Sequence, residues 1–133
     1  HNLKVKYYLR YADDFIILSR DKVCLHNLIY PIKWFLKEKL TLSLHEKKLS
    51  IRKWHQGLDF LGYVSFPHHT ILRTKTKKRM LRKIRRRCIE YKNGEIDEHS
   101  FNHSIQSYRG LLTHCRGRCI EQQIHAILKT FGL

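Results

Sequence analysis

The chain has 133 residues, enough for one domain or two small ones, and 42% of them are hydrophobic. That share argues against intrinsic disorder, because it can supply a packed core. The charge is one-sided: 27 Lys and Arg stand against 11 Asp and Glu, a formal net charge of +16. Such self-repulsion does not stabilise a fold, so the composition predicts a polyanionic partner, with nucleic acid ahead of an anionic membrane surface.

No apolar run approaches the roughly 20 residues that cross a bilayer, and no signal-peptide pattern is present. These features predict a cytoplasmic protein that does not bind a membrane. The chain opens at His1 without an initiator Met, so we expect a piece of a longer protein.

The cysteines form no C-x-x-C pair, which favours free thiols in a reducing compartment. A zinc site is the alternative, although its spacing matches no standard finger. Its candidate ligands are Cys115, Cys119, His114 and His103.

A β-hairpin is predicted at the start of the chain. Residues 4–11 alternate and are rich in β-formers, and residues 15–19 form a short apolar run. Between them stand Ala12, Asp13 and Asp14, which suit a tight turn.

A helix is predicted next, over residues 21–40, where apolar residues recur at helical spacing. Ser19 or Asp21 can cap it, and Pro31 is expected to kink it or divide it in two. Residues 42–53 are predicted to be extended, with a loop that carries lysines.

A second hairpin is predicted from the extended runs 59–66 and 70–74, with its turn at 67–69. Three helices are predicted after it, over 75–92, 97–114 and 118–131. Because the composition changes near residue 73, we expect an α+β fold in two parts, 1–73 and 74–133.

The acid pair Asp13-Asp14 stands at the predicted turn of the first hairpin. Adjacent like charges repel, and Asp disfavours a strand, so the pair is costly unless a cation binds there. Mg²⁺ prefers a few carboxylate oxygens together with substrate phosphates, and two such ions support phosphoryl transfer. The pair therefore predicts a metal site, with a solvated turn as the alternative.

The string Tyr11-Ala12-Asp13-Asp14 resembles the Tyr-x-Asp-Asp signature of reverse transcriptases. Three further motifs follow this string in the order in which they occur in that family. They are the helix and lysine loop at 21–48, the Phe-Leu-Gly hairpin at 58–63 and the thumb-helix string at 107–112. The resemblance is nearest the bacterial group II intron, retron and diversity-generating enzymes. It implies a partial palm of two β-hairpins and a helix over 1–73, followed by a three-helix thumb over 74–133.

The resemblance implies that Asp13 and Asp14 are catalytic ligands of Mg²⁺, with Tyr11 and Ala12 at the cofactor-binding position beside them. The family also needs a third catalytic aspartate, on a strand well before this hairpin. That residue lies outside this chain, so we expect the two-metal site to be completed elsewhere and the chain alone not to polymerise.

The resemblance makes Lys48 the catalytic lysine that protonates the pyrophosphate leaving group, with Lys47 as the alternative. Leu49 follows it, where the family usually has Thr or Ser, and this departure weakens the match.

Nucleic-acid contacts are expected at two places. The resemblance assigns the primer end to the Phe-Leu-Gly hairpin. Residues 73–87 hold ten cations and no acid, and like charges at i,i+4 destabilise a helix unless phosphates neutralise them. The residues predicted to bind nucleic acid are Phe60, Leu61, Gly62, Tyr63, Lys75, Lys78, Arg79, Arg82, Lys83 and Arg86.

The sequence therefore predicts part of an RNA-directed DNA polymerase, a nucleotidyltransferase that extends a primer 3′ end. Its expected partners are an RNA template, a DNA primer, the remainder of the polymerase and an accessory protein of a mobile element. The alternative is a non-catalytic RNA-binding module with a vestigial acidic turn, and a membrane-surface protein is a third reading.

Overall fold

The structure is a computed structural model that describes residues 5–133. It contains four α-helices and two small antiparallel sheets, which confirms the predicted α+β class. The chain forms two compact units, residues 1–53 and 54–133, and each is described by itself.

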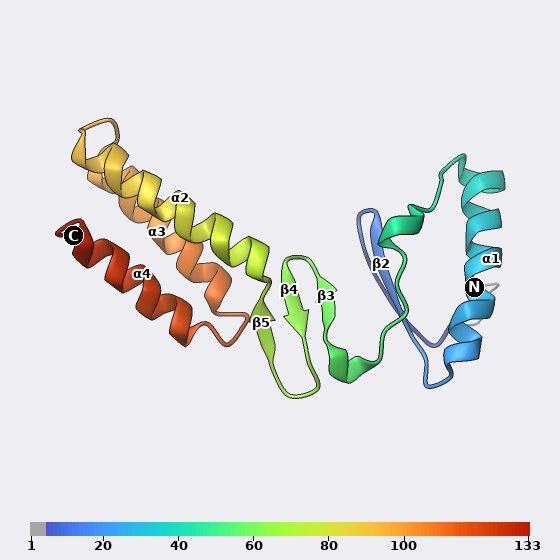
Figure 1. The fold of residues 1–133 in the computed structure, drawn as a ribbon. Coiled ribbons are helices and arrows are strands. Elements are labelled where there is room, and N and C mark those ends of the chain that lie inside the picture. Colours follow the sequence, from blue (N-terminus) through green and yellow to red (C-terminus); the bar gives the residue numbers. More distant parts are fainter. Residues whose placement is uncertain (1–4) are drawn as a thin grey trace. The chain divides into compact units, whose positions relative to one another are not determined.

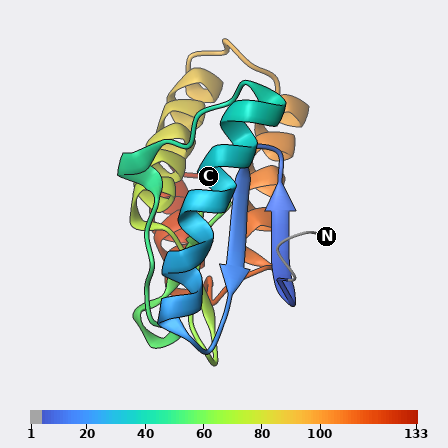
Figure 2. The same ribbon diagram turned by 90° about the vertical axis from the view of Figure 1, so that its right-hand side faces the viewer.

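The first unit begins with a hairpin of two strands, β1 (Tyr7–Tyr11) and β2 (Asp14–Leu18). They pair in an antiparallel register that sets Tyr11 opposite Asp14, so the predicted hairpin is confirmed, although Asp14 belongs to β2 and not to the turn. Helix α1 (Lys22–Leu40) follows and runs alongside the hairpin (Figures 1 and 2). Asp21 caps it, because its carboxylate accepts a hydrogen bond of 2.8 Å from the Val23 amide.

Helix α1 is a single helix of 19 residues with Pro31 inside it, so the proline does not divide the helix. The alternative, a kink at Pro31, stays a prediction. A proline removes one backbone donor, whereas the hydrogen bonds on either side of it remain and carry the helix through. After α1 the chain has no regular structure until η1 (Glu46–Lys48), a single 3₁₀ turn that holds the lysines of the predicted loop.

The second unit starts with η2 (Trp54–Gln56) and a three-stranded sheet. Its strands are β3 (Leu58–Phe60), β4 (Tyr63–Ser65) and β5 (Thr70–Leu72), in the order β3-β4-β5. The hairpin predicted from runs 59–66 and 70–74 is present as the β4–β5 pair, with shorter strands than predicted. The first run also turns back at Leu61-Gly62, so it forms two strands where its extended pattern alone suggested one. That turn agrees with the resemblance to a Phe-Leu-Gly hairpin at 58–63.

Three helices complete the second unit, as predicted: α2 (Thr74–Lys92), α3 (Glu98–Leu112) and α4 (Arg118–Thr130). Gly94, with φ of 72°, provides the left-handed residue after α2. The carboxylate of Asp97 caps α3 through a 2.9 Å hydrogen bond from the Ser100 amide.

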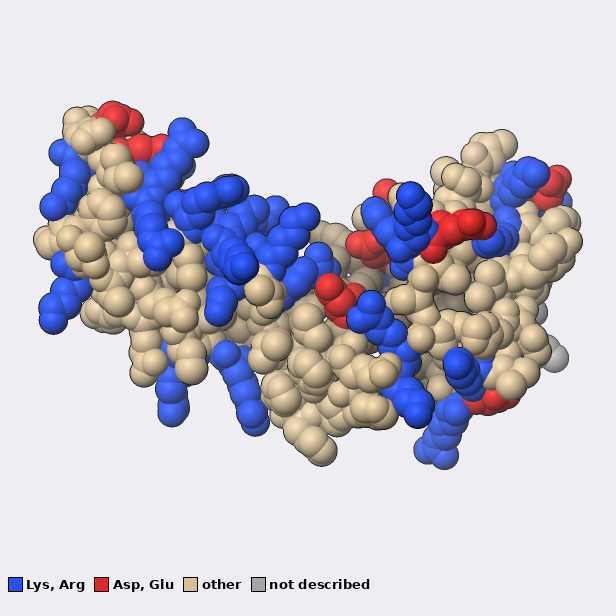
Figure 3. Space-filling view, viewed as in Figure 1, with Lys and Arg blue, Asp and Glu red and all other residues tan. Residues whose placement is uncertain are grey.

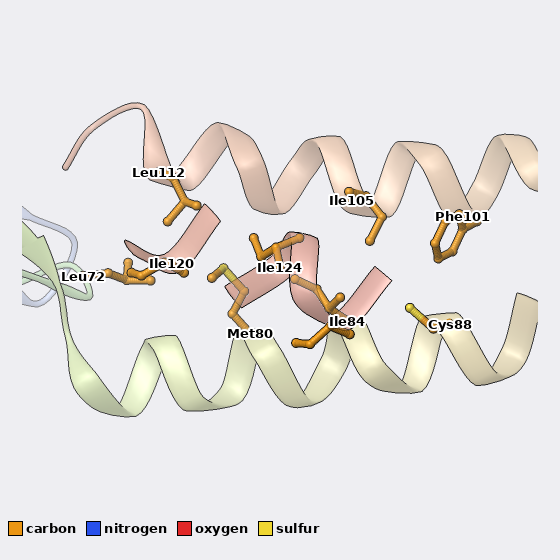
Figure 4. Packing of buried hydrophobic residues seen from close by; sticks show 10 residues of the cluster. Leu72, Met80, Ile84, Cys88, Phe101, Ile105, Leu112, Ile120 and Ile124 are labelled. Atoms are coloured by element: carbon orange, nitrogen blue, oxygen red, sulfur yellow. The ribbon is translucent and has the colours of Figure 1, made fainter. Parts of the chain in front are cut away.

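The hydrophobic core of the described residues lies entirely in the second unit, between its three helices and β5 (Figure 4). Ile84, Cys88 and Ile124 are fully enclosed there. The other buried members are Leu72, Met80, Phe101, Ile105, Leu112, Ile120 and Ile127. Among residues 5–53 none is buried.

Contacts place the boundary between the two units at residues 53 and 54, whereas the sequence suggested a palm–thumb boundary at 73/74. The three-stranded sheet packs with the helices, because Leu72 is only 5% exposed in their core. Two hydrogen bonds add to this, from Tyr63 Oη to the Leu111 carbonyl (3.0 Å) and from the Arg116 amide to the Thr70 carbonyl (2.8 Å). The assignment of residues 1–73 to a palm stays a prediction.

None of the helices in the described part of the chain combines the length and the hydropathy that a bilayer span requires.

Two isoleucines of α2 offer a matched test of this core. Ile84 is fully buried and Ile89 is 49% exposed. We expect Ile84→Ala to lower the free energy of unfolding by about 2–5 kcal/mol, because it leaves a cavity, and Ile89→Ala to change it by less than about 1 kcal/mol. Urea unfolding followed by circular dichroism measures both, and equal effects would contradict the packing described for α2.

Candidate functional site

The tip of the β1–β2 hairpin is a two-residue turn formed by Ala12 and Asp13. Ala12 has φ of 49°, a left-handed conformation that costs an L-residue roughly 1–2 kcal/mol. The Arg10 side chain supports the turn, because its Nε donates a 2.8 Å hydrogen bond to the Ala12 carbonyl. The turn therefore holds two neighbouring carboxylates at a defined tip, since Asp14 begins β2.

Both acids of the tip, Asp13 and Asp14, are exposed. Neither carboxylate forms an ion pair within residues 5–133. Tyr11 lies opposite Asp14 on the same face of the hairpin and is 63% exposed. Two free, hard oxygen donors on one turn fit what Mg²⁺ requires from a protein when phosphates and water complete its coordination.

No cluster of three or more metal-ligating side chains is present among residues 5–133, either at the tip or around Cys115 and Cys119. All four cysteines are free, but only Cys88 is buried. In the described part of the chain, the two carboxylates of the tip are thus the whole protein contribution to the predicted magnesium site, and the zinc alternative has no supporting cluster.

The predicted catalytic lysine lies in η1, which an ion pair between Lys33 Nζ and Glu46 Oε1 (2.6 Å) joins to α1. That ion pair lowers the pKa of Glu46. Lys48 and Lys47 are exposed, and within the described residues neither forms an ion pair with the acids of the hairpin tip. The role of this lysine at the acidic tip, and the choice between Lys47 and Lys48, therefore stay predictions.

The predicted primer-binding residues form the β3–β4 turn. Phe60 and Tyr63 are paired across it, and Leu61 and Gly62 make the turn with φ of 51° and 88°. A left-handed conformation is unusual for a residue as large as leucine, and here it presents a side chain that remains 47% exposed. A two-residue hairpin turn with positive φ at both central positions imposes this conformation, and the leucine side chain is left exposed at the tip.

The β3–β4 turn rests on the start of α2. The Arg73 amide donates a 2.8 Å hydrogen bond to the Gly62 carbonyl. A Cβ atom on Gly62 would lie 3.3 Å from Oγ1 of Thr76, so only glycine fits comfortably. The structure thus brings the predicted primer-binding turn next to the first turn of the basic helix, which the sequence had assigned to a separate part.

The surface over α2 is densely cationic (Figure 3), because Met80, Ile84 and Cys88 turn its apolar side inward. The exposed cations of α2 that form no ion pair within residues 5–133 are Lys75, Lys78, Arg79, Arg82, Lys83, Arg85 and, in its last turn, Lys92. The first turn of α2 has no acid and no side-chain cap, so its lysines face the positive end of the helix dipole. This arrangement is unfavourable for the helix alone and favourable for a bound polyanion.

Three arginines of the basic segment are engaged by acids. Arg73 forms an ion pair with Asp59 before α2 begins. Near its end, Glu90 accepts hydrogen bonds from Arg86 Nε (2.7 Å) and Arg87 Nη1 (2.9 Å), one on each carboxylate oxygen.

Sequence reasoning missed two residues of these sites. Arg10, which supports the acidic turn, carries no signal in the sequence, because its bond to the turn depends on the hairpin register. Glu90 was detectable, because it follows Arg86 and Arg87 at the i,i+4 and i,i+3 spacings at which opposite charges meet on a helix.

Comparisons with known proteins give one partial relative. Over 64 residues the chain is 39% identical to the putative COX1/OXI3 intron 2 protein of Saccharomyces cerevisiae, a match that covers 47% of this chain and 7% of that protein. The match thus spans less than a tenth of the relative's length. No family model matches the chain. The chain is therefore similar in part to an intron protein.

The strained leucine of the β3–β4 turn can be tested by Leu61→Gly. Because glycine adopts positive φ freely and the side chain is half exposed, we expect the free energy of unfolding to stay equal or rise by about 1 kcal/mol. Nucleic-acid affinity should fall instead, as measured by fluorescence anisotropy. A large loss of stability would show that Leu61 serves the fold.

Proposed function

We propose that this chain is part of an RNA-directed DNA polymerase of the reverse-transcriptase type. The observation that carries the proposal is the hairpin tip, where Tyr11-Ala12-Asp13-Asp14 presents two exposed carboxylates without a compensating cation in residues 5–133. An acid pair that the protein leaves unneutralised is suited to a divalent cation. The partial similarity to an intron protein supports a role in a mobile element.

In this proposal Asp13 and Asp14 hold Mg²⁺ at the primer end, while a third acid outside this chain completes the site. Bound Mg²⁺ supplies positive charge that orients a nucleoside triphosphate and stabilises its leaving oxygen. The residues of this chain position that cation: the Ala12–Asp13 turn sets the direction of the carboxylates, and Arg10 fixes the turn. Lys48 or Lys47 is the proposed proton donor to pyrophosphate.

The second unit is the proposed nucleic-acid-binding part. Its cationic α2 neutralises phosphates, which positions a duplex without reading its sequence. Leu61 and Gly62, on the turn packed against the start of α2, contact the end of the strand. The proposed partners are an RNA template and a DNA primer.

A second candidate is a non-catalytic RNA-binding module. It is favoured by the absence of a third metal-ligating side chain near the acids within residues 5–133. In that case α2 would bind RNA in the same way, but Mg²⁺ would not bind the hairpin tip.

The α2 surface is tested by the variant Arg79→Gln/Arg82→Gln, measured against Arg118→Gln/Lys129→Gln on α4. All four cations are exposed and free of ion pairs in the described residues, so the two variants remove equal charge. For an RNA–DNA duplex, we expect the first variant to flatten the slope of log K against log salt by about 2, because each lost phosphate contact removes about 0.9. The α4 variant should leave the slope nearly unchanged, and equal slopes for the two variants would refute this surface.

The metal site is tested by Asp13→Asn, with Glu38→Gln as a control that removes another exposed acid of the same unit. Mn²⁺ added in place of Mg²⁺ should broaden the amide signals of residues 11–16 in the wild type and in the control, and much less in Asp13→Asn. In a polymerase that includes this chain, Asp13→Asn should abolish DNA synthesis and spare template binding. Retained synthesis would rule out the polymerase assignment, and absent broadening would favour the RNA-binding module.

A further inference from the structure

The basic segment of the second unit, residues 73–87, forms ion pairs with acids at both of its ends. Asp59 engages Arg73 just before α2, and Glu90 engages Arg86 and Arg87 near its end. Between these acids lie six exposed cations without an ion pair in residues 5–133, from Lys75 to Arg85. Beyond Glu90 the helix carries one more such cation, Lys92 in its last turn. The continuous row of unpaired cations on α2 is therefore confined to its first three turns.

The continuous row of unpaired cations from Lys75 to Arg85 is called the nucleic-acid track. We propose that Glu90 ends this track by keeping Arg86 and Arg87 in ion pairs, so that they do not bind phosphates. This inference rests on the proposed nucleic-acid binding and adds its extent. It replaces Arg86, a residue that the sequence predicted as a contact, by Arg85 as the last cation of the track.

The geometry of Glu90 supports this role. One carboxylate uses both oxygens, Oε1 for Arg86 and Oε2 for Arg87, and its side chain is only 15% exposed while Arg86 is 80% exposed. The hydrogen bond from Arg86, together with that from Arg87, lowers the pKa of Glu90, so the acid is charged at neutral pH. The same carboxylate charge repels a phosphate that approaches either arginine.

Further acids follow Glu90 along the chain. Glu95, Asp97 and Glu98 follow at the connection between α2 and α3, and Figure 3 shows acidic side chains at that end of the second unit. At the opposite end of α2, the Arg73 amide donates a hydrogen bond to the Gly62 carbonyl of the β3–β4 turn. These three acids thus lie at the end of α2 away from the proposed strand terminus.

The open track has a definite length. From Lys75 to Arg85 it covers about 15 Å at the 1.5 Å rise per helical residue. At about 3.4 Å per base pair this corresponds to four or five base pairs. The chain should therefore gain no further contact along α2 from a longer duplex.

The test compares Glu90→Gln with Glu95→Gln in the whole chain, using a short RNA–DNA duplex as the probe. Each variant removes one negative charge, but only the first releases arginines, because Glu95 bonds the side chain of Asn93 instead. We expect Glu90→Gln to steepen the slope of log K against log salt by about 1–2, as one or two new phosphate contacts form. Glu95→Gln should leave the slope unchanged.

Variants of the two arginines test whether they cause the effect of Glu90→Gln. Arg86→Gln/Arg87→Gln should not alter the slope in the wild type but should cancel the increase in the Glu90→Gln background. A flatter slope for the arginine variant in the wild type, or an unchanged slope for Glu90→Gln, would overturn the inference. If Arg79→Gln/Arg82→Gln also leaves the slope unchanged, the proposed function of α2 fails as well, so the two failures are distinguishable. Circular dichroism confirms that each variant remains helical.

Discussion

The apolar seam of α2, centred on Ile84, is the contact on which the second unit depends. Ten cations lie between residues 73 and 87, and their mutual repulsion opposes a helix at this place. Burial of Met80, Ile84 and Cys88 against α3 and α4 outweighs that repulsion and fixes which side of α2 faces outward. The same seam therefore stabilises the bundle and creates the cationic surface.

The first unit is built differently, because none of its described residues is buried. A two-stranded hairpin is marginal in water without further packing. Its shape depends on local devices: the strand register, the Arg10–Ala12 bond and the Asp21 cap of α1. Those devices place Asp13 and Asp14 side by side without any enclosed core beneath them.

The sequence predicted most elements where period and caps agree, as at the β1–β2 hairpin and at Asp97 before α3. It failed where one local feature competed with a longer pattern. Pro31 suggested a division that does not occur, because hydrogen bonds on either side carry the helix through. The extended pattern of residues 59–66 suggested one strand, because leucine is rarely left-handed, and only the resemblance to a Phe-Leu-Gly hairpin indicated the turn at Leu61. The acids and cations of the candidate site were readable as residue types. The Arg73–Asp59 pair was not readable, since it joins residues 14 apart through the sheet, whereas the Glu90 pairs follow helical spacing.

Hydrogen bonds from the Arg73 amide to the Gly62 carbonyl and from Tyr63 Oη to the Leu111 carbonyl join the β3–β4 turn to the helix bundle. A strand terminus seated at Leu61 and phosphates seated on α2 would keep one constant spacing while the polymer advances. The second unit would then act as a gauge, which measures a fixed length of duplex back from its growing end.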